Sequence, residues 1–169
     1  MVKDIFEAYV KNRNALNPFR DSKTDEWQTA YVISMSEFSN LLKTVPYKSD
    51  PLFGIIDYTG NMDIFFEPRT IGRDCDAFAR AWVLWGVHNG YNAYEMIVTT
   101  TVHPFVDAHV VTILSKDNNF YLCNYEAFGP FTSFDNALND LKRWERYADG
   151  FISAYGVYKE AIDGRQAHG

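Results

Sequence analysis

The longest apolar stretch of the chain lies near its middle, between Ala77 and Val87, where nearly every side chain is apolar. A helix that is apolar around its whole circumference lies inside a fold rather than on its surface. Asn89-Gly90 follows, and glycine favours the left-handed conformation that ends many helices. The pattern therefore predicts a buried central helix, against which the rest of the chain packs.

Three apolar segments follow this helix at close spacing, and they predict strands over 91–102, 108–115 and 120–125. The polar residues 116–119 separate the last two segments and are typical of a tight turn. These two strands are therefore expected to pair antiparallel as a hairpin.

The hairpin predicts a contact between two polar side chains. If the turn pairs Ser115 with roughly Asn118, His109 lies opposite Asn124, and directly opposed side chains point to the same face of a sheet. Because side chains alternate along a strand, Cys123 is expected to point to the other face. The pattern thus places an imidazole and a carboxamide side by side.

The segments on either side of this core carry weaker patterns. Residues 2–13 predict a short amphipathic helix, and Ser34 with Glu37 forms a capping box that opens a second helix. Residues 53–58 and 62–66 predict a strand and its return.

The C-terminal part predicts one more helix and one more strand. Thr132 or Ser133 caps the helix, and residues 151–159 are apolar and aromatic enough for the strand. The core face of this helix is expected to carry Phe134, Ala137, Leu138, Leu141 and Trp144.

No repeat or low-complexity tract divides the 169 residues, so we expect one α+β domain in which a central buried helix packs on an antiparallel sheet with flanking helices. Its parts are a core over about 70–126, N-terminal helices and a wall over 1–69, and a C-terminal helix and strand over 132–160. Hydrophobic residues make up 47% of the chain and aromatic residues 17%. Such a composition is typical of a packed core.

Charge and cysteine content limit the possible partners and location. The net charge of -6 argues against a general nucleic-acid surface. No apolar run is long enough to cross a bilayer, and acidic residues interrupt the N-terminus where a signal peptide would be apolar. Two cysteines cannot form a disulfide framework. We therefore expect a reduced, cytoplasmic protein without nucleic-acid or membrane partners.

Cys75 stands where a loop is expected to become the central helix. Asp74 is a good candidate for the N-cap, which places Cys75 at or near the first helical position. Free amide hydrogens and the helix dipole favour negative charge there, and thus the thiolate form of the side chain. The alternative is structural, because most free cysteines are buried and simply pack.

Cys75, His109 and Asn124 together have the residue types that acyl transfer through a thiolate requires. Cys75 would be the nucleophile, His109 the general base and then acid, and Asn124 would fix the imidazole orientation. The amide of Cys75 would donate to the oxyanion, with weaker oxyanion or substrate-binding candidates at Thr70 and Asp76.

Three segments carry a family resemblance. Asp74-Cys75-Asp76-Ala77-Phe78-Ala79 resembles the cysteine motif of the transglutaminase-like cysteine peptidases, which typically reads Asp-Cys-Glu-Asp-Phe-Ala. Residues 109–114 resemble that family's histidine strand, and residues 120–124 resemble the strand that ends in its third member. The resemblance covers roughly residues 70–126.

This resemblance implies a papain-like α+β core and cleavage of a peptide or amide, or glutamine-directed acyl transfer, on a peptide or protein substrate. The chain departs from the family at Ala77, where an acid is usual, and at Asn124, where aspartate is usual. Papain-type enzymes use asparagine in that role. Cys123 would take the third position if the strand register shifted by one residue.

Two other functions compete with a thiol enzyme. A zinc site from Cys75, His109 and Cys123 would lack a close ligand pair, and no acidic loop with calcium-ligand spacing occurs, so no metal or other cofactor is expected. The stronger alternative is a transglutaminase-like module for protein binding or structure, in which the triad is vestigial. His88 and His103 are interpreted as histidines outside the site.

Overall fold

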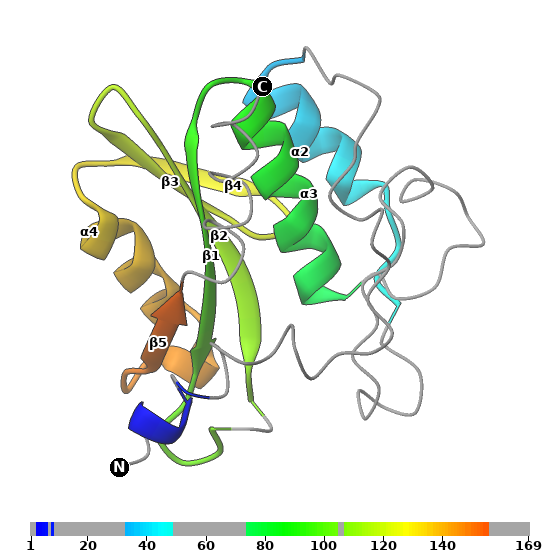
Figure 1. Cartoon of the computed structure of the whole chain (residues 1–169). Coiled ribbons are helices and arrows are strands. Elements are labelled where there is room, and N and C mark those ends of the chain that lie inside the picture. Colours follow the sequence, from blue (N-terminus) through cyan, green and yellow to red (C-terminus); the bar gives the residue numbers. More distant parts are fainter. Residues whose placement is uncertain (1–2, 7, 9–32, 49–73, 105–106, 156–169) are drawn as a thin grey trace.

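The computed structural model describes residues 3–6, 8, 33–48, 74–104 and 107–155 (Figure 1). Its elements, in chain order, are α2 (Met35–Lys43), α3 (Cys75–His88), β1 (Asn92–Thr99), β2 (His109–Lys116), β3 (Asn119–Cys123), β4 (Ala127–Phe131), α4 (Phe134–Asn139), the 3-10 turns η2 (Asp140–Arg143) and η3 (Glu145–Tyr147), and β5 (Ile152–Tyr155).

The strands form one antiparallel sheet in the order β4-β3-β2-β1-β5. Helices α2 and α3 lie on one side of this sheet and α4 lies on the other (Figure 1). The protein is therefore α+β, with a helix packed on an antiparallel sheet, as the sequence predicts. Among the described residues, no helix is both long and apolar enough to cross a membrane.

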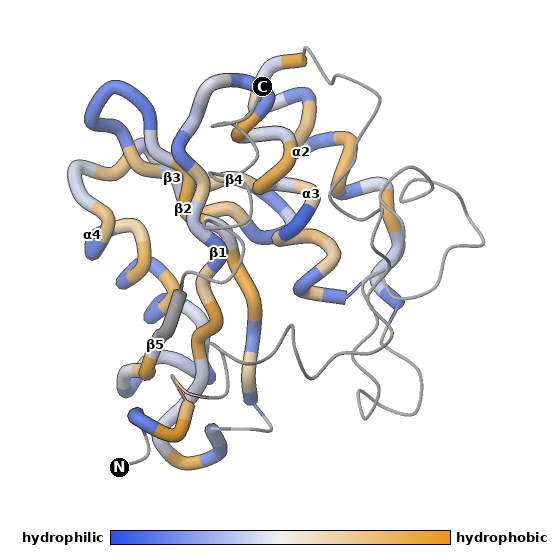
Figure 2. The backbone as a smooth tube through the Cα atoms, in the orientation of Figure 1, coloured by the Kyte–Doolittle hydropathy of each residue, from blue (hydrophilic) through white to orange (hydrophobic). Residues whose placement is uncertain are grey.

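The two faces of the sheet bury separate parts of the core. On the α3 face, Trp82 and Trp85 pack with Phe38 of α2, and Leu114 of β2 joins them. On the α4 face, buried side chains of β1, β2 and β3 pack against α4 and the 3-10 turns. The tip of the β2–β3 hairpin is hydrophilic, in contrast to the strands behind it (Figure 2).

Helix α3 confirms the predicted central helix. Trp82 is fully buried, and Gly86 lies so close to Leu114 that the two leave no space for a Cβ. Gly90 follows the helix with a φ of 76°, a conformation that glycine adopts without strain. Asp74 occupies the predicted N-cap position with the extended backbone usual there, but the predicted capping hydrogen bond is wrong, because its side chain makes none.

The β2–β3 hairpin forms as predicted, but in a different register. The φ angle is 51° at Asp117 and 61° at Asn118. Asp and Asn tolerate this left-handed region better than most residues. They form a two-residue turn that pairs Lys116 with Asn119 and Ser115 with Phe120. The predicted pairing of Ser115 with Asn118 is therefore wrong by two residues, a shift that keeps every side chain on its predicted face.

Further differences concern the flanking elements. Sequence patterns do not predict β4 and predict a longer C-terminal helix, whereas the Ser133-capped α4 ends at Asn139 and gives way to η2 and η3. The predicted last strand forms as β5, which pairs with β1. The Ser34 capping box is confirmed. Residues 3–6 and 8 are helical, whereas the predicted strands at 53–58 and 62–66 lie outside the described residues.

Candidate active site

His109 and Asn124 are in direct contact, with 3.2 Å between Nε2 of the imidazole and Oδ1 of the carboxamide. A carboxamide oxygen only accepts hydrogen bonds, so this contact requires the proton on Nε2. In the neutral ring, Nδ1 then carries the free lone pair. The pair thus fixes one imidazole tautomer and leaves Nδ1 as the atom able to accept a proton.

The contact forms even though the strand register differs from the predicted one, because β3 ends just before Asn124. Asn124 opens the short loop to β4, and its N–H donates to the carbonyl of Glu126 at 3.0 Å. Its own carbonyl accepts a 2.6 Å hydrogen bond from the indole Nε1 of Trp82, in the middle of α3. Strand end and helix together therefore turn the Asn124 side chain towards His109.

Cys75 is the first residue of α3 and is partly buried. It packs in a small apolar cluster with Phe6, Ile97 and Val110, the last of which directly follows His109. This cluster fixes the start of the helix against the ends of two strands.

Cys75 and His109 lie on opposite faces of the sheet: Cys75 packs with Val110 on the α3 face, whereas His109, the residue before Val110, packs under Trp144 on the α4 face. Burial raises the pKa of Tyr125, the residue after Asn124, and a negative charge on Cys75 would raise it further. Burial also raises the pKa of Tyr147 to about 12, with a smaller contribution from Cys75. The Tyr147 hydroxyl in turn donates to the carbonyl of Asp107, two residues before β2 begins.

The environment of His109 keeps its ring neutral. Burial lowers the pKa of His109 to about 4; the hydrogen bond to Asn124 opposes this shift and the positive charge of Arg146 reinforces it. At neutral pH the imidazole is therefore a base with a free lone pair, not a cation.

Aromatic side chains cover His109, a feature that the sequence pattern does not predict. The ring of Trp144 meets the imidazole edge to face, with 5.8 Å between ring centroids, and the ring of Tyr147 lies 6.3 Å from Trp144. The sequence pattern places Trp144 on the core face of a longer helix. In the structure, the break of that helix into 3-10 turns lets both rings reach the start of β2.

Cys123 does not take the third position of the site. It is fully buried among side chains of the α3 face, whereas Asn124, the next residue, points to His109. Burial raises the pKa of the Cys123 thiol well above the usual range. Asn124 is thus the residue that His109 contacts, and the two cysteines have different environments.

Four further residues from the sequence analysis are Thr70, Asp76, His88 and His103. Thr70 lies outside the described residues. Asp76 is in the first turn of α3 and only 3% exposed, so a role in binding substrate stays a prediction. His88 and His103 are exposed, at the end of α3 and in the β1–β2 loop. In the described ranges no three His, Cys, Asp or Glu residues gather as metal ligands would.

Comparison with known proteins does not assign the site. The chain matched no family model, no curated protein and no solved structure.

Proposed function

We propose that the protein is a small thiol enzyme that transfers the acyl group of a peptide or amide. Cys75 is the nucleophile, His109 the general base and acid, and Asn124 the residue that orients the imidazole. The contact of 3.2 Å between His109 and Asn124 carries this proposal. It leaves Nδ1 free to accept a proton, as a general base must. The transglutaminase-like cysteine motif and a papain-like fold would fit the same roles.

The proposed reaction requires the Cys75 thiol and His109 Nδ1 to come within hydrogen-bond reach at the end of the sheet. Nδ1 then removes the thiol proton as the Cys75 sulfur attacks the substrate carbonyl carbon. The backbone N–H of Cys75, at the start of α3, stabilises the oxyanion. The bond from carbon to nitrogen then breaks, and the leaving amine takes the proton from Nδ1. Water attacks the thioester with His109 again as base, which releases the acid and restores the thiol.

The neutral state of His109 favours this order of proton transfer. With the pKa of the imidazole at about 4, a stable pair of thiolate and imidazolium would not form at neutral pH. The proton would instead move during the attack. The same observation favours the second candidate, a catalytically inactive module for binding or structure, because a buried histidine without a charge can also be purely structural.

Acylation by p-nitrophenyl acetate tests the proposal, with the acetylated residue identified by mass spectrometry. We expect acetylation of Cys75, and His109→Ala should slow it by about a hundredfold or more, the range of general-base catalysis. Cys123→Ala is the matched control, since its buried thiol should not react and the rate should not change.

Equal acetylation of Cys75 in the wild type and in His109→Ala would reject the assigned role of His109. An unreactive Cys75 would favour the module instead.

A further inference from the structure

A loop of three residues, Asn124 to Glu126, joins β3 to β4, and its first side chain is the one that contacts His109. The strands flanking this loop pair at Cys123 and Ala127. A short loop between paired strands transmits a shift at one of its ends to the other. The position of Asn124 therefore depends on what holds the loop at both ends.

Helix α3 holds the first part of the loop. Trp82 donates to the Asn124 carbonyl, and the ring of Phe78 meets the ring of Tyr125 edge to face at 4.7 Å. Both α3 residues are fully buried. These contacts fix the depth of the loop over the helix.

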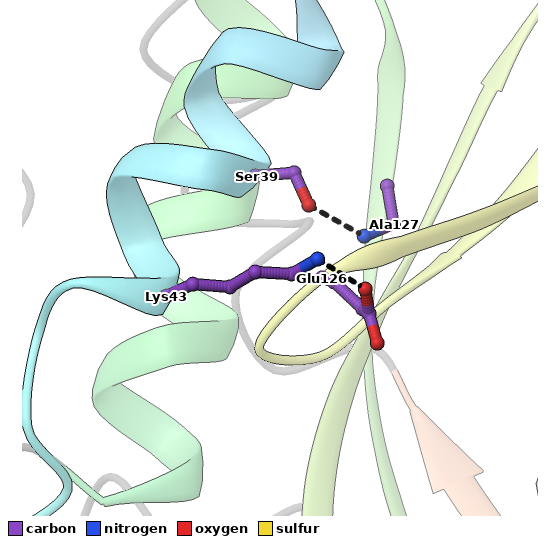
Figure 3. A network of polar contacts seen from close by, with 4 residues as sticks. All are labelled: Ser39, Lys43, Glu126 and Ala127. Carbon is purple, nitrogen blue, oxygen red and sulfur yellow. Dashed lines mark hydrogen bonds and ion pairs between the residues drawn. The ribbon is translucent and has the colours of Figure 1, made fainter.

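Helix α2 holds the second part of the loop through two side chains one turn apart (Figure 3). The hydroxyl of Ser39 accepts a 3.2 Å hydrogen bond from the backbone N–H of Ala127, and Lys43 forms a 2.6 Å ion pair with Glu126. Ser39 is only 8% exposed, while both members of the ion pair are about half exposed. Since Asn124 donates to the carbonyl of Glu126, this second anchor connects directly to the site.

Helix α2 is itself firmly placed. Its capping box satisfies the first turn, with the hydroxyl of Ser34 accepting from the N–H of Glu37. Phe38 packs edge to face on Trp82 and stacks on Trp85, with ring centroids 4.9 Å and 5.5 Å apart. The helix can therefore act as a rigid support for the loop.

We infer that Ser39 and Lys43 are positioning residues of the site: they hold Glu126 and Ala127 so that Asn124 keeps the His109 ring in the tautomer with Nδ1 free. The inference rests on the proposed function for its effect on acyl transfer. Its effect on the hydrogen bond between His109 and Asn124 does not depend on that function. The two effects can be measured separately.

The first experiment removes the buried hydroxyl with Ser39→Ala, and Ser36→Ala, on the exposed side of the same helix, is the matched control. Hydrogen exchange of the His109 Nε2 proton, measured by NMR, should become about two- to tenfold faster in Ser39→Ala, the equivalent of one hydrogen bond. Acetylation of Cys75 should slow by a similar factor. Ser39→Thr, which keeps a hydroxyl, should restore most of both values.

The second experiment uses the exposed ion pair, which can be changed with little risk to folding. Lys43→Glu should speed exchange of the Nε2 proton about two- to threefold, since exposed pairs contribute little. The double variant Lys43→Glu with Glu126→Lys should restore it, because the pair is re-formed with reversed charges.

Two outcomes separate the inference from the proposed function. If exchange and acetylation in Ser39→Ala equal those in Ser36→Ala, and the charge reversal has no effect, the inference is wrong. If Cys75 fails to react even in the wild type while Nε2 exchange still responds to Ser39, the proposed function is wrong and the positioning role stands.

Discussion

The two faces of the sheet contribute to the candidate site in different ways. The α3 face supplies Cys75 at the start of a long helix, which two buried tryptophans hold in place. The other face supplies His109, which is covered by Trp144 at the junction of the two 3-10 turns, and Tyr147 of η3 packs on Trp144. One face thus fixes the position of Cys75, the proposed nucleophile, and burial on the other face keeps His109, the proposed base, neutral.

Substitutions on the two faces should therefore change different properties of the same site. Changes on the α3 face should alter stability and the placement of Asn124, because Trp82 binds the Asn124 carbonyl. Changes on the other face should alter the pKa of His109, because burial is the largest cause of its shift.

The largest expected effect is the loss of folding stability at low pH that the burial of His109 causes. The folded pKa of His109 is lowered to about 4, below the usual value of 6.5, so between these pH values the unfolded state binds more protons. Stability should therefore fall as the pH falls through this window, by about 3 kcal/mol from this residue alone. Urea unfolding of the wild type and of His109→Gln at about pH 4.5 and pH 7, near the two ends of the window, measures the difference.

His88→Gln is the control for this measurement, since His88 is exposed and should leave the pH dependence unchanged. An equally steep loss of stability in His109→Gln would show that other groups cause it.

The sequence predicted the elements whose patterns are strongest. The central helix was predictable because nearly all of its side chains are apolar, and a helix that is apolar all round is buried in the core. The contact of His109 with Asn124 was predictable because alternation puts both on one face, and the two-residue error in register kept that face.

Other features depend on tertiary packing that local patterns do not carry. Strand β4 contains Gly129 and Pro130, residues that are unfavourable in strands, so it lacked a strand pattern. Asp74 is a typical N-cap residue and occupies that position, but its side chain makes no capping hydrogen bond. The place of Trp144 over His109 depends on the break of the C-terminal helix after Asn139, which the helical periodicity does not reveal.

A smaller effect is expected on the α3 face. Trp82→Phe keeps an aromatic ring against Phe38 but removes the donor to the buried Asn124 carbonyl. Leaving that acceptor unpaired should cost about 2 kcal/mol of the free energy of unfolding. Trp85→Phe is the matched control on the same helix, because its longer, 3.3 Å bond to the Ile33 carbonyl is only partly buried. Equal losses in urea unfolding would contradict the special role of Trp82.

The smallest expected effect tests the aromatic cover directly. Trp144→Ala should let water reach the imidazole, which weakens the burial that lowers the pKa of His109. The pKa should rise by about one unit towards the usual value, equivalent to about 1.4 kcal/mol, and NMR titration of the ring measures it. Phe134→Leu, whose ring packs on Tyr94 of the same face, is the control. A His109 pKa that rises equally in both variants would assign the effect to loosening of the whole face, whereas a rise confined to Trp144→Ala assigns it to this single ring.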